Sequence, residues 1–344
     1  MFVPDFDVIH GFPPDYMHGV LLGVMKMMWD FFTCTSNHQK PFYVGLQLKE
    51  VEKRMISIRP PSAFPRYPGK LEDIKKNKAT DWEHILYHYF FPCFYGILPQ
   101  PFLDHFMLLS SSVFNLLDLH LSPEKIDSCE TSINSFVAQF EKFYGENNMV
   151  FNVHLLTHLS QCARNFGALW NSSLYPYESA NGMILNYRTG NNHPVVQITK
   201  KYVMHRICQN SRIPETSPAY TWHSEIWNST KKQDLHFDRR FVYELSQDVS
   251  IDDYIEQREF SYHDRIHVGN IQYRTHKSCR DLGYDDSYVC IYGEFFRIEQ
   301  ILTDTNSETY IVGLKLITCK LFDNMFTYSI SDSMLKTEMS SHDD

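Results

Sequence analysis

The stretch 81–144 constrains the fold most, because its apolar residues recur at every third or fourth position. The pattern holds in three successive groups: Trp82, Ile85, Leu86, Tyr89 and Phe90; Phe106, Leu109, Val113, Leu116 and Leu117; Ile133, Phe136, Val137 and Phe140. An apolar face with this period is typical of helices that share a core. Prolines fall within 91–101 and 121–123. We therefore predict an all-α block whose helices are joined by proline-containing connections.

Further helices are predicted on both sides of this block. One runs from about His18 to Phe32, and Asp15 is well placed to cap its start. Another begins at the pair His154 and His158 and ends near Gly167. Two more are expected over 178–187 and 195–208. The loop RPPSAFPRYPGK holds too many prolines to be helical throughout.

The C-terminal part has a different texture. The segments DSYVCIYGEFFRIEQIL and ETYIVGLKLITCKLF alternate apolar with polar residues and are rich in β-branched and aromatic types, and TDTNS between them is a turn signal. We predict a mainly α fold with a small β-rich module at 263–330. The mixed segment 211–262 reads as a linker, and 331–344 as a disordered tail.

Charge and composition limit the classes of partner and compartment. The net charge of −9 argues against nucleic-acid binding over the whole surface. No CxxC occurs among the eight cysteines, and scattered thiols suit the cytosol or nucleus. The N-terminus has no signal-peptide pattern, so we expect a protein that is not secreted. The longest apolar stretch, GVLLGVMKMMWDFF, is too short and too charged to span a membrane.

One local basic stretch runs against the overall charge. Between Lys53 and Lys78 there are eight basic residues against Glu72 and Asp73, a net of +6. Such a stretch can neutralise DNA phosphates, and the alternative is a solvated loop. The candidate DNA contacts here are Arg59, Arg66, Lys70, Lys75, Lys76 and, as a ring that could stack on a base, Trp82. For Trp82 the alternative is a buried position on an amphipathic helix, and Trp170 is also expected in the core.

Two pairs of side chains have the spacing of metal ligands. His154 and His158 stand four residues apart, so two imidazoles lie one helical turn apart on one face. Asp15 and His18 stand three apart at a predicted helix start and could complete a four-ligand zinc site. The alternatives are a core or exposed histidine pair and a plain helix cap. Glu178, also near a helix start, is either a carboxylate favoured by the helix dipole or a magnesium ligand for phosphoryl transfer.

The motifs taken in order resemble a known family. DYMHGVLLGV, RPP, TDWEHILYHYFFPCFYGILP, NVHLLTHL and FGALWNSSLYPYESANG look like the DDE transposase domain of CACTA (En/Spm)-type elements and their animal relatives, a group similar to the catalytic subunit of the vertebrate RAG recombinase. The resemblance covers roughly 1–210. It implies an RNase H-like domain with a helical insertion at about 33–150, placed before the last catalytic acid.

Site residues follow from the resemblance by matching motif. Asp15 and His18 match the family's D-x-x-H residues and His154 and His158 its His pair, which together imply a structural Zn²⁺. Glu178 matches the terminal acid of the catalytic triad, which implies catalytic Mg²⁺ and DNA as the substrate, acted on in the nucleus. The β module matches a β-rich segment of plant relatives in texture only, and a protein partner for it is one expectation.

One departure qualifies this expectation. The family's first two aspartates lie upstream of its D-x-x-H motif, and only fourteen residues precede Asp15. We therefore expect a truncated gene model, a decayed copy or one part of a longer protein, without strand transfer by this chain alone. The rival interpretations are a domesticated, non-catalytic DNA-binding or chromatin-interaction protein and a zinc-stabilised helical scaffold unrelated to DNA. Whether the chain forms a homo-oligomer stays open.

Overall fold

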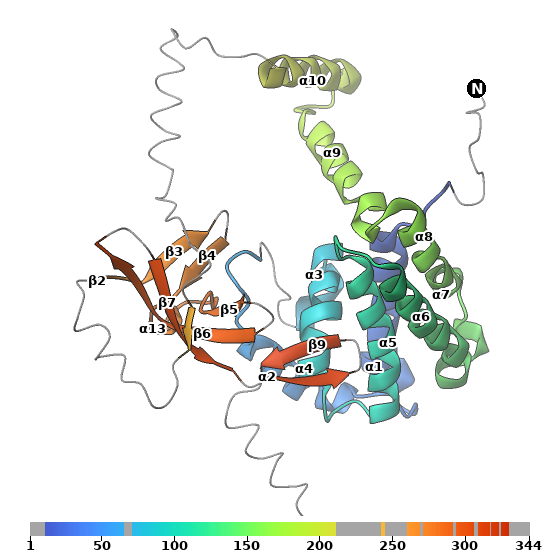
Figure 1. Cartoon of the computed structure of the whole chain (residues 1–344). Coiled ribbons are helices and arrows are strands. Elements are labelled where there is room, and N and C mark those ends of the chain that lie inside the picture. Colours follow the sequence, from blue (N-terminus) through green and yellow to red (C-terminus); the bar gives the residue numbers. More distant parts are fainter. Residues whose placement is uncertain are drawn as a thin grey trace, which may run out of the picture. The chain divides into compact units, whose positions relative to one another are not determined.

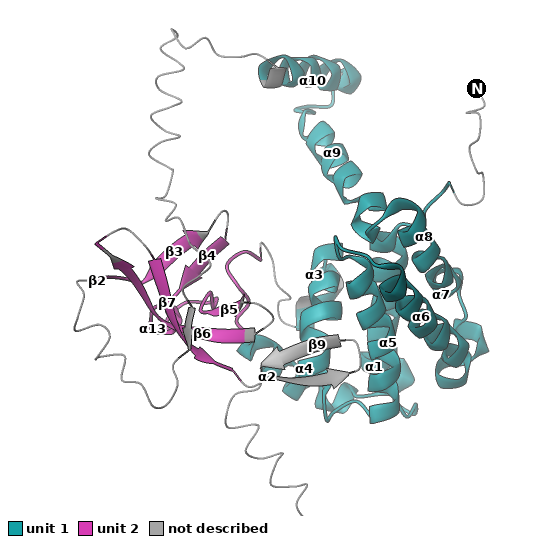
Figure 2. Cartoon of the chain, in the orientation of Figure 1, with its two compact units in different colours: residues 1–58, 66–212 teal, residues 59–65, 213–344 magenta. Residues whose placement is uncertain are grey.

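The change of periodicity in the sequence coincides with a division of the structure. The computed structural model describes residues 11–64, 71–210, 242–244, 260–268, 271–291, 294–305, 309–316, 318–322 and 325–329. They fall into two units, coloured separately in Figure 2: Met1–Ile58 with Arg66–Arg212, and Arg59–Pro65 with Ile213–Asp344. The first contains the predicted helices and the second the predicted β module, so the mainly α character with a small C-terminal sheet is confirmed.

The first unit begins with the helix predicted after Asp15. A π-helical segment, η1 (Met17–Met25), continues directly into α1 (Lys26–Thr33), and their apolar residues face the core. The other longer elements of the first half are α2 (Leu48–Ser57), α3 (Ala79–His84), the π-helical η5 (Ile85–Tyr89) and α4 (Phe90–Phe94). A short 3₁₀ segment, Leu71–Lys76, precedes α3.

The long antiparallel pair α5 (Gln100–Leu116) and α6 (Pro123–Tyr144) forms the middle of the unit (Figure 1). Prolines stand at the start of both helices, where the missing N–H costs no hydrogen bond. Phenylalanine rings pack α4 against α5: Phe90 stacks on Phe94, also on α4, and on Phe106 of α5, with ring centroids 4.2 and 3.6 Å apart. Burial of these large rings is the main source of stability for this part of the fold.

Further helices follow and lead to the C-terminal end of the unit. They are α7 (Phe151–Leu155), η7 (Leu156–His158), α8 (Leu159–Phe166), η8 (Leu169–Ser172), α9 (Tyr175–Asn186) and α10 (Pro194–Asn210). Gly167 ends α8 with φ 80°, a conformation that other residues rarely adopt, as its place in the sequence predicted. The described residues of this unit contain helices and turns but no strand, so an RNase H-like sheet stays an expectation of the resemblance.

The second unit is built on a small sheet. Its strands are β1 (Val242–Glu244), β2 (Phe260–His263), β5 (Tyr288–Ile291), β6 (Glu294–Asp304) and β7 (Thr309–Lys315), in the order β1-β7-β6, with β2 and β5 both paired to β6. The predicted turn joins β6 to β7, whose Thr303 and Thr309 are paired. All pairings are antiparallel except β1 with β7.

Two hairpins and one short helix complete the described part of this unit. β3 (Arg265–Val268) pairs with β4 (Ile271–Arg274), and β8 (Thr318–Phe322) pairs with β9 (Met325–Ser329). The helix α13 (His276–Cys279) follows β4 and is capped by Thr275. The predicted linker 211–262 is wrong where β1 and β2 lie, because these segments pair with the sheet. The rest of it and the predicted tail 331–344 lie outside the described residues.

Membrane insertion finds no support in the helices. None of those in the described part of the chain is long and apolar enough to cross a bilayer.

Candidate functional site

Asp15 is the residue that joins two distant segments of the helical unit. Its carboxylate accepts hydrogen bonds from the backbone N–H groups of Met17 and His18, at 3.3 and 3.0 Å, as the predicted cap of the helix start. It also accepts the backbone N–H of Leu174, at 3.0 Å, from a segment 159 residues later. Leu174 immediately precedes α9, so one carboxylate caps two helices at once.

His18 extends this connection to Glu178. Its Nδ1 contacts the Asp15 carboxylate, and its Nε2 lies 3.0 Å from Oε1 of Glu178 in the first turn of α9. The ring can donate at both nitrogens only as the imidazolium. The Glu178 side chain is 57% exposed, which leaves its carboxylate accessible from solvent. The predicted D-x-x-H residues and the predicted terminal acid therefore meet in one place.

A second carboxylate, that of Glu83, connects the two segments that carry this site, and the sequence alone did not indicate it. Glu83, on α3, accepts hydrogen bonds from the Tyr16 and Tyr175 hydroxyls at 3.2 and 3.3 Å. Tyr16 follows Asp15, and Tyr175 lies one helical turn before Glu178, so this bridge fixes both sides of the site. Burial raises the pKa of Glu83, and burial together with the nearby Glu83 raises those of Tyr16 and Tyr175.

His154 and His158 face one another as their spacing predicted. Their Nε2 atoms are 3.3 Å apart, so these two ring nitrogens face each other. His158 also lines a pocket of about 240 Å³, and Phe12, Pro13 and Pro14 form part of its other wall. These three residues lead directly into Asp15. The histidine pair is thus close to the segment that carries the D-x-x-H motif.

The side chains predicted to bind zinc are already engaged with other groups. Both oxygens of Asp15 accept backbone or ring hydrogen bonds, and both ring nitrogens of His18 face carboxylates. Across the described residues, no three His, Cys, Asp or Glu side chains are grouped so that they could hold a metal ion. In this arrangement the four side chains form two separate pairs and do not fit one tetrahedral site. The zinc ion stays a prediction of the resemblance.

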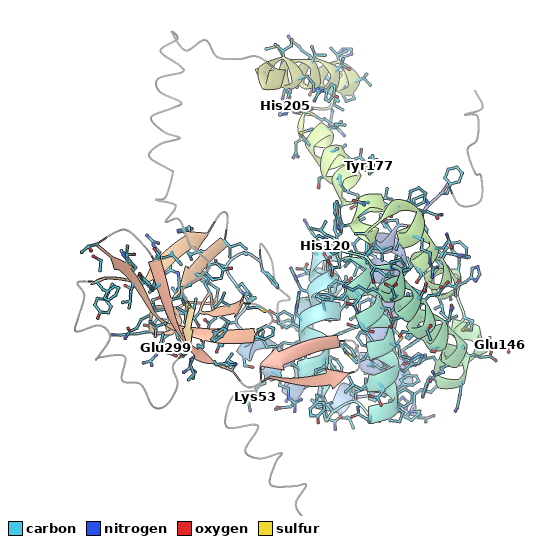
Figure 3. The ribbon with its side chains drawn as sticks, viewed as in Figure 1. Lys53, His120, Glu146, Tyr177, His205 and Glu299 are labelled. Atoms are coloured by element: carbon cyan, nitrogen blue, oxygen red, sulfur yellow. The ribbon has the colours of Figure 1, made fainter. Side chains whose placement is uncertain are left out.

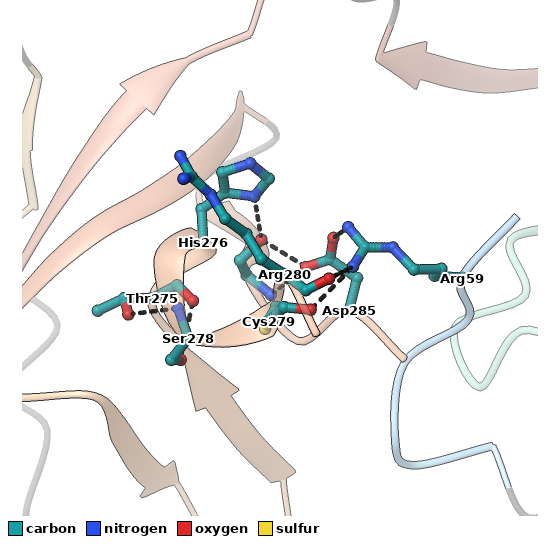
Figure 4. Close-up of polar contacts among 8 residues, drawn as sticks. Arg59, Thr275, His276, Ser278, Cys279, Arg280 and Asp285 are labelled. Atoms are coloured by element: carbon teal, nitrogen blue, oxygen red, sulfur yellow. Dashed lines mark hydrogen bonds and ion pairs between the residues drawn. The ribbon is translucent and has the colours of Figure 1, made fainter. Parts of the chain in front are cut away.

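Arg59, a predicted DNA contact, has a structural role in the second unit (Figure 4). Its guanidinium donates to Oδ2 of Asp285 at 2.7 Å and to the carbonyl of Cys279 at 2.8 Å. Asp285 is only 7% exposed and also accepts the Ser287 N–H and hydroxyl. His276 completes this cluster through a 3.3 Å contact with the Ser287 hydroxyl. This ion pair satisfies a nearly buried carboxylate. The Arg59 side chain is 33% exposed, and its contact with a phosphate stays a prediction.

The other predicted DNA contacts have different outcomes. Trp82 is 2% exposed and packs edge-on against Trp29, so its stacking on a base is wrong and its alternative place in the core is confirmed. Lys76 is exposed. Arg66, Lys70 and the side chain of Lys75 lie outside what the structure describes. Trp170, expected in the core, is 47% exposed instead.

Comparison with known proteins adds no family to this geometry. No protein-family model matches the sequence, and neither curated proteins nor solved structures gave a match.

Proposed function

We propose that this chain is a transposase-derived protein that binds DNA, and that Glu178 is the carboxylate it contributes to phosphoryl transfer. One observation carries the proposal. Asp15 of the D-x-x-H motif accepts the N–H of Leu174, and His18 of the same motif lies 3.0 Å from the terminal acid Glu178, so segments about 160 residues apart meet in the order of motifs that suggested the family. A chance match of short motifs gives no reason for these segments to meet.

The position of Glu178 suits the proposed role. It lies in the first turn of α9, where the helix dipole favours a negative charge. Magnesium ions held by such carboxylates would activate the attacking oxygen and neutralise the phosphate. This chain's own contribution is to hold the carboxylate at the surface, oriented by His18 and by the Asp15 bond to Leu174.

A non-catalytic form of the same proposal is favoured by a second observation. Two-metal chemistry needs several carboxylates. Among the described residues, Glu178 belongs to no group of three or more His, Cys, Asp or Glu side chains that could hold a metal ion. The chain would then bind DNA without cutting it. Incubation with a supercoiled plasmid and Mg²⁺ separates the two forms, because nicking that disappears in Glu178→Gln supports catalysis.

Duplex binding tests the proposal itself. The full chain is titrated into a fluorescently labelled duplex of ~30 bp, and anisotropy is read at ~50 mM and ~200 mM NaCl. Displacement of counterions by basic side chains predicts measurable binding at the lower salt and at least ~10-fold weaker binding at the higher salt. A folded chain that binds no duplex at ~50 mM salt overturns the proposal.

A further inference from the structure

We infer that the helix pair α9–α10 is the surface that binds the DNA backbone, with Lys200 and Lys201 neutralising its phosphates. This inference rests on the proposed function above. It moves the interface away from the basic stretch 53–78, where the sequence predicted it. Four properties of the two helices support it: their exposure, their charge, their defined connection and their place beside Glu178.

Exposure distinguishes these helices from all other longer helices described in the unit. No described residue of α9 or α10 is buried, although both helices are rich in apolar residues. Figure 3 labels Tyr177 on α9 and His205 on α10, and the side chains of both helices project into open space. Isolated helices of this length are marginal in water, because most helical stability in proteins comes from packing. A partner that covers them is therefore expected.

The charge of the pair indicates the chemistry of this partner. From Ser179 to Asn210 there is no Asp or Glu, while Arg188, Lys200, Lys201 and Arg206 are basic, in a chain whose acids outnumber its bases 41 to 32. Lys200 and Lys201 are both exposed. A local positive surface on an acidic protein attracts a polyanion. Duplex DNA carries a negative charge every ~1.7 Å along its axis, which matches this requirement.

The connection between the helices is well defined. The Oε1 atom of Gln197, on α10, accepts the backbone N–H groups of Thr189 and Gly190 at 2.8 and 3.2 Å. The rings of Tyr187 and His205 lie 5.9 Å apart and pack the two helices together. These contacts hold α10 at a fixed place relative to α9. A bound phosphate backbone would then be held at a fixed distance from the helix start that carries Glu178.

Charge also decides between DNA and a second copy of this chain. Val196, Val203 and Ile207 are exposed at spacings of seven and four, so they form one face of α10, and Lys200 lies between them. Two copies that met through this face would bring lysines of like charge together in a poorly solvated contact, which is unfavourable. The phosphates of a duplex would instead neutralise the lysines, and the flanking aliphatic side chains can pack against its deoxyribose groups.

The basic stretch predicted from the sequence is less suited to this role. Arg59 is held by Asp285, and Arg54 is held by Glu50 and by the carbonyls of Cys93 and Tyr95. Lys53 lies within 4.0 Å of Glu50. Acidic partners and backbone carbonyls therefore satisfy Arg59 and Arg54 before any DNA arrives, whereas the Lys53 side chain is 80% exposed.

Charge reversal tests the inference. Lys200→Glu/Lys201→Glu is compared with a matched control, Lys49→Glu/Lys53→Glu, which changes the charge equally on α2 at two exposed positions. In the anisotropy assay the α10 variant should bind the duplex at least ~10-fold more weakly, and the slope of log affinity against log salt should fall by about 2. The control should change affinity less than ~2-fold. Circular dichroism checks that both variants keep their helices.

The outcomes separate this inference from the proposed function. If the wild-type chain binds DNA and the α10 variant binds equally well, the surface is wrong and the function stands. An equal loss in the control also overturns the surface, since only total charge would then matter. If the wild-type chain does not bind DNA, both fail. Sedimentation at several concentrations shows whether, in any of these three cases, α10 instead joins two copies of the chain.

Discussion

The imidazole Nε2 of His18 lies 3.0 Å from the Glu178 carboxylate, although 160 residues separate them in the chain. The contact is at the surface, since the two side chains are about half exposed. Exposed ion pairs contribute little to stability, whereas the Asp15 carboxylate on the other side of the imidazole satisfies backbone groups of two helices. We therefore assign the orientation of the Glu178 carboxylate to His18, and the stability of the site to Asp15.

Substitutions should separate these two roles. Asp15→Ala removes a helix cap and the bond to the Leu174 N–H, so we expect the free energy of unfolding to fall by about 1–2 kcal/mol. Glu178→Gln should change it by less than about 0.5 kcal/mol, because only an exposed ion pair is lost. Urea denaturation followed by circular dichroism measures both. Unfolding of Glu178→Gln as severe as that of Asp15→Ala would show a structural carboxylate and remove the basis for its catalytic assignment.

Arg59→Ala should destabilise the β unit and leave DNA binding unchanged. The substitution leaves the Asp285 carboxylate nearly buried and without its cation, at a cost of about 1–3 kcal/mol for a partly exposed pair. Arg59→Lys keeps the charge, but a lysine cannot donate to both the Asp285 carboxylate and the Cys279 carbonyl as the guanidinium does. We therefore expect an intermediate loss of stability. Lys53→Ala, at an exposed position, is the control. Intact stability together with lost DNA affinity would restore the phosphate contact that the sequence predicted.

Acid should weaken the helical unit through its buried histidine. Burial lowers the pKa of His105 to about 4 from an ordinary value of 6.5, and its ring bonds the Phe136 carbonyl and lies 3.2 Å from the Tyr144 hydroxyl. Between pH 6.5 and 4 the unfolded chain binds more protons at this residue than the folded chain. The contribution of His105 to the unfolding free energy should therefore fall by about 3 kcal/mol as pH drops through this window.

A non-titrating variant checks this assignment. His105→Gln should flatten the pH profile between pH 6.5 and 4 without abolishing its slope, because burial also lowers the pKa of His88 to about 4. The variant will start from a lower stability at neutral pH, so the slopes and not the absolute values are compared. An unchanged slope would mean that other groups dominate acid unfolding.

The resemblance makes its own prediction about zinc. If Asp15 and His18 turn toward His154 and His158, the purified chain should hold about one zinc ion, which His154→Ala should lose. Elemental analysis of both proteins, after dialysis against a weak chelator, measures this. A folded wild-type chain without zinc would contradict that part of the resemblance. The contact between His18 and Glu178 would remain, since it needs no metal.

Local patterns in the sequence predicted most of the helices and the central strands of the sheet, but not α2, β1 or β2. The apolar period around Phe90 and Phe106 and the alternation along β6 each report the environment of one element. Contacts between distant residues have no such local signature. The partner of Arg59 lies 226 residues away, and nothing near Glu83 indicates that Tyr16 and Tyr175 donate to it. Only the order of motifs linked Asp15 to Glu178 before the structure did.

Exposure was harder to predict than secondary structure. Trp82 and Trp170 both stand in apolar surroundings in the sequence, yet one is buried and the other is half exposed. The helix α10 is rich in apolar residues, yet none of its described side chains is buried. Whether an apolar residue is buried depends on what packs against it, which a single local pattern does not contain.

Amide hydrogen exchange of the full chain with and without a saturating DNA duplex tests the central claim most directly. We predict that DNA slows exchange in α9 and α10, from Tyr175 to Asn210, and at the Asp15–His18 segment, while α2 is unaffected. Slowed exchange at 48–78 without any change in α9 and α10 would contradict the proposed surface. No change anywhere, under conditions where the protein is folded and the duplex is present in excess, would contradict the proposal that this chain binds DNA.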